Sequence, residues 1–420
     1  MIYGWSKDAT EDLVKFLKKL NADITAINPT SGIYLTTQTF HGKVYSFYDT
    51  KSAKVYLGSS NFSKNGFSQK YSYWCYRKNT KNRTGKKIRN RKMRICIFGA
   101  GAIGGMLGSL LKKSGVDVIL VARGEHFRRI KEKGLIFQSK EYDLDVCQKF
   151  EIYDNIDDIG NFDLLISGLK AHSSNKMAFK MSKLLKNESI FLPTLNGVPW
   201  WFFYGLEGKY NDYKIKTVDP DSLQWNYIKP SRVIGSVVYP AAEINSPGTI
   251  KHIEGKRFIL GEPNNLVSER VSIISKLFYS AGIKAPISKD IRSDIWLKLI
   301  GNSSFNPISV ITNSHLKDIC ENDETRSIVK KMMAEASAIG LKFNLKLKLD
   351  IEKRIEGARK VGEHKTSTLQ DYENKKPLEI DALTKVLIEL GSITNTSTNT
   401  IETVYKLTKY LAKKRNCYPD

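Results

Sequence analysis

Short apolar runs separated by turn residues fill the chain from residue 93 to about residue 286, and helical periodicity follows from about Asp290 onward. The first run, Ile95 to Phe98, is rich in β-formers and leads into an apolar-periodic helix that includes residues 106–111. Further strands are predicted at 117–122, 162–167, 189–192, 235–240, 247–255 and 258–263. Strands that alternate with helices predict an α/β fold with a doubly wound parallel sheet, and the later periodicity predicts an all-helical C-terminal domain.

Three glycines with the G-x-G-x-x-G spacing follow the first strand, in the turn Gly99-Ala100-Gly101-Ala102-Ile103-Gly104. In such a turn Gly99 permits the tight bend, Gly101 lets the backbone approach a pyrophosphate, and Gly104 lets the helix pack close to the strand. The phosphate then lies on the exposed amides at the start of the helix. A flexible glycine loop is the alternative, and the second strand after the helix favours a dinucleotide site.

The second strand ends at Arg123 and Gly124, where NAD-binding proteins usually carry an acidic residue. A cation at this position suits a 2′-phosphate, so the sequence predicts NADPH rather than NADH as the cofactor. A solvated surface arginine is the alternative interpretation.

Lys170 and Asn196 come directly after two later strands, at the sheet edge where ligands bind in this architecture. In the first C-terminal helix, Lys298, Asn302 and Asn306 recur every four residues, so one ammonium and two amides share a polar stripe. Apolar neighbours predict that this helix is largely buried. Because burial lowers the pKa of an amine, Lys298 is a candidate proton donor.

Residues 93–420 resemble the ketopantoate reductase (2-dehydropantoate 2-reductase) family. The resemblance rests on the order and spacing of the glycine turn, Arg123, Leu169-Lys170-Ala171, Leu195-Asn196-Gly197, Lys298-x3-Asn302-x3-Asn306-Pro307, Thr366-Ser367-Thr368-Leu369-Gln370-Asp371 and Glu379-Ile380-Asp381.

This resemblance implies NADPH-dependent reduction of 2-dehydropantoate to pantoate, a step in the biosynthesis of pantothenate (vitamin B5) and coenzyme A. It implies that Lys298 is the general acid and that Glu379 orients the lysine and the substrate hydroxyl. It places substrate contacts at Asn196, Asn302, Asn306 and Ser367, and cofactor contacts at Gly99, Ala100, Gly101, Ala102, Ile103, Gly104, Arg123, Lys170 and Asn196. Trp200-Trp201-Phe202-Phe203 and an insertion at 214–225 depart from the family pattern, which leaves a different 2-oxo acid as the alternative substrate.

The first 76 residues contain a separate set of short apolar runs that carry His41, Lys43, Ser60 and Asn61. On a strand, His41 and Lys43 point to one face, where the histidine can attack a phosphodiester and the lysine can hold its oxygens. Ser60 and Asn61 can add phosphate contacts. This H-x-K … G-S-x-N pattern resembles the phospholipase D superfamily of nucleases, particularly a restriction-endonuclease-like branch, and implies a small α+β fragment.

Two departures limit this second resemblance. The superfamily expects an acid five residues after the lysine, whereas Tyr48 stands there and Asp49 follows one place late. The superfamily also builds one active site from two motifs, and this chain has one. Nuclease activity therefore requires a homodimer that pairs two copies of His41, and a truncated remnant or a plain β-hairpin are the alternatives. The reductase motifs are complete, so the sequence favours a reductase over a phosphodiesterase or a nucleic-acid-binding protein.

The positive charge is uneven, because residues 1–92 contain 18 Lys and Arg against 5 Asp and Glu, about half of the net +24 of the chain. Residues 77–92 contain no acid and almost nothing to bury, which predicts a basic linker that can lie against phosphates. General richness in Lys, Asn and Ile, typical of an AT-rich coding sequence, is the other explanation. The expected domains are 1–76, 77–92, 93–286 and 287–420.

A content of 41% hydrophobic and 26% charged residues is ordinary for globular domains. No run approaches the roughly 18 apolar residues of a membrane span, and the first eight residues have no signal-peptide core, so we expect a cytoplasmic protein. Separately, we expect it to be a monomer or a homodimer. The cysteines are odd in number and dispersed without metal-ligand spacing, which predicts reduced thiols and no metal site. They are Cys75, Cys96, Cys147, Cys320 and Cys417.

Overall fold

The computed structural model describes residues 32–35, 43–48, 55–59 and 93–419, without 158 and 349, and the chain divides into two compact units, residues 1–72 and 73–420. The finer domain boundaries remain predictions. In the first unit, β1 (Gly32–Leu35), β2 (Lys43–Tyr48) and β3 (Val55–Ser59) form an antiparallel sheet in that order. Lys43 is paired with Ser59. His41, Ser60 and Asn61 lie outside the described residues.

A five-stranded parallel sheet with the order β10-β9-β4-β5-β8 forms the centre of the second unit. Its strands are β4 (Ile95–Phe98), β5 (Val118–Val121), β8 (Glu151–Tyr153), β9 (Phe162–Ser167) and β10 (Leu185–Pro193). All four residues of β4 are buried, and they alternate between two cores: Ile95 and Ile97 in one, Cys96 and Phe98 in the other. This confirms the predicted parallel sheet of an α/β fold, with the Rossmann-like arrangement.

Helix α2 (Ala102–Lys113) lies between the central sheet and a second sheet. A Cβ on Gly108 would lie 3.0 Å from Leu120 of β5, and one on Gly105 would lie 2.9 Å from Ile250 on the opposite side. The second sheet has the order β12-β13-β6-β7 and consists of β6 (Leu135–Ser139), β7 (Leu144–Gln148), β12 (Ala241–Ser246) and β13 (Thr249–Glu254).

The predicted strands at 235–240, 247–255 and 258–263 therefore belong to two different sheets. β11 (Gly235–Val238) pairs with β14 (Phe258–Gly261) and lies beside β10 through the Ile234 amide, which donates to the Phe191 carbonyl. β12 and β13 instead join β6 and β7. The remaining helices of this part are α3 (Gly124–Lys133), α4 (Ala171–Lys176), α5 (Ala178–Lys183) and α6 (Glu269–Ser280).

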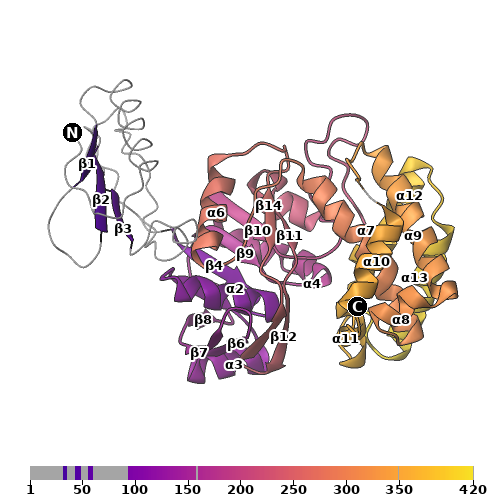
Figure 1. Cartoon of the computed structure of the whole chain (residues 1–420), viewed down its shortest axis with the longest axis horizontal. Coiled ribbons are helices and arrows are strands. Elements are labelled where there is room, and N and C mark those ends of the chain that lie inside the picture. The colour runs from indigo at the N-terminus through magenta and orange to yellow at the C-terminus, as the bar shows by residue number, and fades with distance from the viewer. Residues whose placement is uncertain are drawn as a thin grey trace. The chain divides into compact units, whose positions relative to one another are not determined.

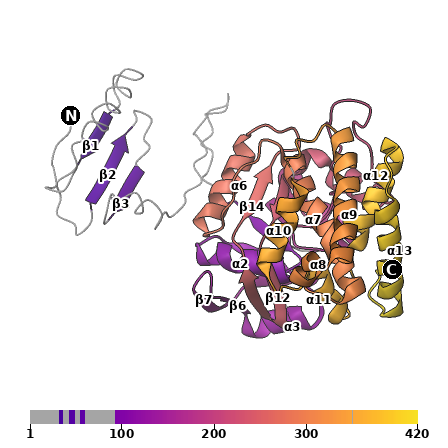
Figure 2. The same cartoon turned by 45° about the vertical axis from the view of Figure 1, so that its right-hand side comes forward.

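The C-terminal part is helical, as predicted, and gathers at one side of the sheets in both views (Figure 1, Figure 2). Its first helix, α7, begins after Asp290, whose side chain accepts a hydrogen bond from the Ser293 amide, and it contacts β11 and β14. The helices are α7 (Ile291–Thr312), α8 (Leu316–Glu321), α9 (Asp323–Lys342), α10 (Ile351–Val361), α11 (Ser367–Glu373), α12 (Val386–Thr394) and α13 (Asn399–Lys414), with a π-helical turn at Asp381–Lys385.

The aromatic run that departs from the family pattern is a packing element. Trp200, Trp201, Phe202 and Phe203 are fully buried in the core that α7 also enters. Phe202 packs against Trp296 of α7 with ring centroids 5.5 Å apart. The buried Arg292 guanidinium at the start of α7 donates to the carbonyls of Phe202 and Tyr204 at 2.5 Å. This segment therefore anchors α7 to the sheet domain.

Candidate active site

The glycine turn has the geometry that a dinucleotide phosphate requires. Gly99 has a φ of 98°, which favours glycine, and a Cβ on Gly104 would lie 2.1 Å from the Gly99 carbonyl oxygen. A Cβ on Gly101, by contrast, would meet no atom within 4 Å. No side chain caps the start of α2, so its first amides are available to a ligand. The residues present here thus fit the phosphates of a dinucleotide.

Arg123 is exposed at the end of β5, directly before α3. One turn further along, His126 makes a contact that the sequence did not indicate. Its Nε2 lies 2.8 Å from the Ala100 carbonyl oxygen in the glycine turn, and its Nδ1 accepts a hydrogen bond from the Gly248 amide at 3.0 Å. Burial lowers the pKa of His126, and the neutral ring with its proton on Nε2 satisfies both contacts. His126 therefore holds the glycine turn against the β12–β13 hairpin.

Lys298 projects from α7 to the carboxyl ends of the strands. Its ammonium donates to Asn196 Oδ1 at 2.5 Å and to the Val238 carbonyl. Burial lowers the pKa of Lys298 to about 8, and the nearby Glu379 carboxylate opposes that shift. The structure thus brings the predicted proton donor together with Asn196 and Glu379, although they are far apart in sequence.

Glu379 connects the helical part to the sheet domain. Its Oε1 accepts a hydrogen bond from the Ala171 amide at 2.9 Å, and burial raises its pKa while Lys170 lowers it. The Lys170 ammonium donates to Asp371 Oδ2 at 2.5 Å and to the Pro377 carbonyl at 3.2 Å. In this structure Lys170 therefore bridges to α11, and its predicted contact with the cofactor remains a prediction.

The loop that carries Asn196 is also fixed from the helical side. Gly197 has a φ of 90°, and a Cβ there would lie 2.3 Å from the Ala382 carbonyl oxygen. The next amide, that of Val198, donates to the same carbonyl at 3.1 Å. Ala382 lies in the π-helical turn, three residues after Glu379. The contact between Gly197, Val198 and Ala382 therefore positions the Asn196 loop relative to the Glu379 carboxylate.

The residues of the predicted polar stripe on α7 contact different partners. Lys298 turns to Asn196, whereas Asn306 is buried and its Nδ2 donates to Thr368 Oγ1 of α11 at 3.0 Å. Asn306 thus positions α11. Asn302 is half-buried between them, and Ser367 is exposed in the first turn of α11. The substrate contacts expected of Asn302, Asn306 and Ser367 remain predictions.

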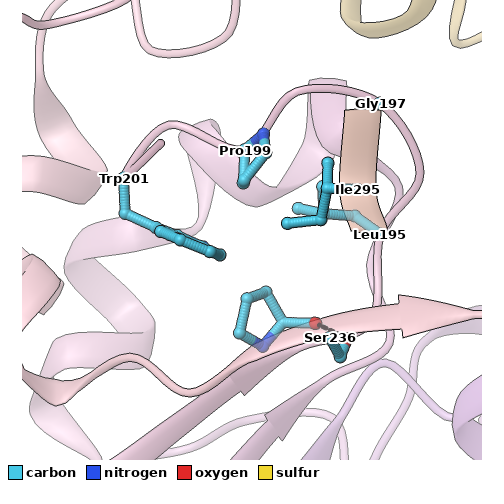
Figure 3. A pocket seen from close by; sticks show the side chains of 7 residues that line it. Leu195, Gly197, Pro199, Trp201, Ser236 and Ile295 are labelled. Atoms are coloured by element: carbon cyan, nitrogen blue, oxygen red, sulfur yellow. Dashed lines mark hydrogen bonds between the residues drawn. The ribbon is translucent and has the colours of Figure 1, made fainter. Parts of the chain in front are cut away.

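A small hollow lies beside the Asn196 loop (Figure 3). Its space for water centres is about 10 Å³, enough for about one water molecule. The Ser236 hydroxyl donates to the Pro193 carbonyl at 2.6 Å, so its one hydroxyl is already engaged. The hollow has no titratable side chain and cannot supply acid–base chemistry. Its lining residues are Pro193, Leu195, Gly197, Pro199, Trp201, Ser236 and Ile295.

Two expected absences concern only the described residues. Within residues 93–419 and the three N-terminal strands, no helix is long and apolar enough to cross a membrane. In the same part of the chain, no group of three or more His, Cys, Asp or Glu converges on a point that could hold a metal ion. The described cysteines are free thiols.

Three family models match the chain: "Ketopantoate reductase PanE/ApbA" at residues 95–265, "Ketopantoate reductase PanE/ApbA C terminal" at 290–412, and "NgoFVII restriction endonuclease N-terminal PLD domain" at 1–89. A 2-dehydropantoate 2-reductase of Mesorhizobium japonicum is 44% identical over 328 residues, which are 78% of this chain and all of the relative. The chain belongs to the ketopantoate reductase family.

Two solved structures have the same fold. A protein described as "a putative ketopantoate reductase from Ralstonia solanacearum MolK2" is 34% identical, with a TM-score of 0.75 over 78% of this chain and 100% of its own. The ternary structure of a D-mandelate dehydrogenase with NADH superposes with a TM-score of 0.67 over 77% of this chain and 99% of its own, and at 20% identity it shows the fold alone. Both predicted resemblances are confirmed, and the chain is an oxidoreductase of a nicotinamide-dependent family.

Proposed function

We propose that this ketopantoate reductase homologue reduces 2-dehydropantoate to pantoate with NADPH, and that Lys298 is the proton donor. The observation that carries the proposal is the Lys298 ammonium, which is held by Asn196 and the Val238 carbonyl beside Glu379. When bound, NADPH supplies the hydride that the carbonyl carbon accepts.

The chain's own residues supply the proton and the orientation. Addition of hydride to a 2-oxo acid makes an alkoxide, and protonation of that oxygen by the Lys298 ammonium completes the 2-hydroxy acid. A pKa of about 8 suits this role, because the amine is protonated at neutral pH and still gives up its proton readily. Asn196 holds the ammonium through its side-chain oxygen, so the donor has one fixed direction.

Glu379 is proposed to stabilise the protonated lysine and to accept a hydrogen bond from the substrate hydroxyl. Its charge favours the ammonium form of Lys298, which opposes the effect of burial. The contact from the Ala171 amide occupies Oε1 and leaves the rest of the carboxylate for the lysine and the substrate.

The choice of NADPH rests on Arg123. It follows β5 and Gly101 follows the adjacent parallel strand β4, so both residues lie at the carboxyl edge of the sheet, and Arg123 is exposed. A guanidinium binds a phosphate through paired hydrogen bonds, so Arg123 is proposed to hold the 2′-phosphate that distinguishes NADPH from NADH.

The test is NADPH oxidation by the purified full chain with a panel of 2-oxo acids that includes 2-dehydropantoate and phenylglyoxylate. We expect the highest kcat/KM with 2-dehydropantoate. In the Lys298→Ala variant turnover falls by about 10² or more, as for other positioned proton donors, whereas Lys331→Ala, an exposed lysine of α9, retains normal turnover. A preference for phenylglyoxylate would refute the substrate, and normal turnover in Lys298→Ala would refute the mechanism.

A second activity is proposed for residues 1–76, because the restriction-endonuclease PLD model matches this segment and the strand register places Lys43 opposite Ser59. Phosphodiester cleavage would need two copies of the His41 motif, so it should occur only in a homodimer. Cleavage of DNA by a monomer, through His41, would contradict this requirement.

A further inference from the structure

Arg354 of α10 carries a guanidinium that finds no partner among the described residues. Its Nε is buried and makes no hydrogen bond. Burial lowers the pKa of Arg354, and the one titratable group that opposes this is Tyr239. On the same helix Arg359 is paired with both Glu356 and Glu321. The Arg354 side chain as a whole is partly exposed. A partly buried cation without a counter-charge is unfavourable, so a ligand that supplies the missing anion is favoured here.

The guanidinium lies against the bare backbone of α7 at Gly301. A Cβ at this position would lie 2.7 Å from Arg354 Nη2 and 3.0 Å from its Nε. Glycine weakens the interior of a helix, and here it makes the space that the guanidinium fills. Gly301 follows Lys298 by three residues, so the two lie on neighbouring positions of one helix face.

Tyr239 connects Arg354 with the reaction centre. Its ring centroid is 5.7 Å from the Lys298 ammonium, and Tyr239 is close enough to Arg354 to influence the pKa of that guanidinium. Tyr239 follows Val238, whose carbonyl holds Lys298. At 38% exposure, its side chain can be reached from solvent. The accessible Tyr239 ring therefore lies beside Lys298 and within electrostatic reach of Arg354.

We propose that Arg354 binds the carboxylate of the 2-oxo acid, while Lys298 serves the carbonyl oxygen on the neighbouring carbon. This inference rests on the proposed function. A 2-oxo acid presents an anion and a reducible carbonyl on adjacent carbons. An ammonium from α7 and a guanidinium from α10 that packs against the same face of α7 match that pair of groups. The planar guanidinium can hold both carboxylate oxygens at once. Gly301 provides the space that this arrangement needs.

The inference assigns the recognition of the substrate carboxylate to Arg354. A neutral ketone, such as the methyl ester of the same 2-oxo acid, leaves Arg354 unpaired and should be a poor substrate. The carboxylate requirement thus depends on one side chain, separate from the residues that transfer the proton.

The experiment compares kcat/KM for 2-dehydropantoate and its methyl ester, with NADPH, in the full chain and in Arg354→Gln. We expect the wild type to prefer the acid, and Arg354→Gln to lose about 10²- to 10³-fold on the acid, the usual result of truncating a buried charge pair. The ester should be reduced as before, which also reports an intact fold. Arg354→Lys should recover part of the loss on the acid, and Lys353→Gln, an exposed neighbour on α10, should behave as wild type.

An equal loss on acid and ester would show a structural role for Arg354, and no loss on the acid would show that it does not touch the carboxylate; either result overturns the inference. Calorimetric titration of the same variants with 2-dehydropantoate separates this from the proposed function. If the wild type binds the acid without turnover and Arg354→Gln binds it much more weakly, the proposed reaction fails and the carboxylate site stands. Equal binding by both refutes the site.

Discussion

Replacement of Lys298 by methionine should change how the stability of the protein depends on pH. Methionine has a similar length and no charge, so the variant removes the titration of one buried amine. In the folded protein burial lowers the pKa of Lys298 from 10.5 to about 8, which means that folding disfavours the ammonium form. The wild type therefore carries an energetic cost at neutral pH that the variant lacks.

The sign and the size of the effect follow from this shift. Because the folded pKa is the lower one, between about pH 8 and pH 10.5 the unfolded chain holds an extra proton, and the stability of the wild type rises with pH. A shift of about 2.5 units corresponds to roughly 3 kcal/mol, and solvent at the half-buried side chain reduces this to about 2–3 kcal/mol. Methionine also lacks the hydrogen bonds of the lysine ammonium. Their loss shifts the free energy of unfolding of the variant by a constant amount, because methionine does not titrate.

The assay is urea unfolding of the full chain at pH 7, 8, 9 and 10, followed by tryptophan fluorescence, for the wild type, Lys298→Met and Lys331→Met. We expect the free energy of unfolding of the wild type to gain about 2 kcal/mol relative to Lys298→Met between pH 8 and pH 10. Lys331→Met should follow the wild type, because Lys331 is exposed. Parallel pH profiles for the wild type and Lys298→Met would refute a lowered pKa at this lysine.

Three further predictions concern the cofactor site and the first unit. Gly101→Ala should keep wild-type stability and raise KM for NADPH, because its Cβ meets only open space, whereas Gly104→Ala should lower the melting temperature, because its Cβ would lie 2.1 Å from a carbonyl oxygen. Arg123→Asp should raise KM for NADPH at least about tenfold more than KM for NADH, since a charge-assisted phosphate contact is lost; a wild type that already prefers NADH would contradict the assignment. His41→Ala should leave the kinetic parameters for NADPH oxidation unchanged, and a slower reductase would show that the first unit contributes to it.

The strands and the site motifs were predictable where the signal is local. Ile95–Phe98 is buried on both faces and is apolar throughout, so its run identifies it. The edge strand β7 alternates between partly buried and exposed residues and contains Asp145 and Gln148, so no apolar run marks it. The sequence also could not show that β12 and β13 join a separate sheet, because this arrangement depends on how closely α2 packs against the β12–β13 hairpin.

Contacts between distant side chains account for the rest of the site. Lys298 and Asn306 share one periodicity on α7. Lys298 nevertheless donates a hydrogen bond to Asn196, whereas Asn306 donates to Thr368, and only the packing of α11 determines this difference. The His126 ring makes a hydrogen bond with Ala100 in the glycine turn, 26 residues earlier in the sequence, and no sequence motif predicts this contact. Gly301 was the one available clue to Arg354, because a glycine inside a buried helix usually marks a close approach.

The pH dependence of kcat/KM for 2-dehydropantoate tests most directly whether Lys298 is the proton donor. The amine must be protonated to act, so kcat/KM in the wild type should be level below about pH 8 and fall about tenfold per pH unit above it. Lys298→Ala should show a much smaller kcat/KM without this fall. A wild-type profile that stays level up to pH 10, or the same fall in Lys298→Ala, would contradict the account.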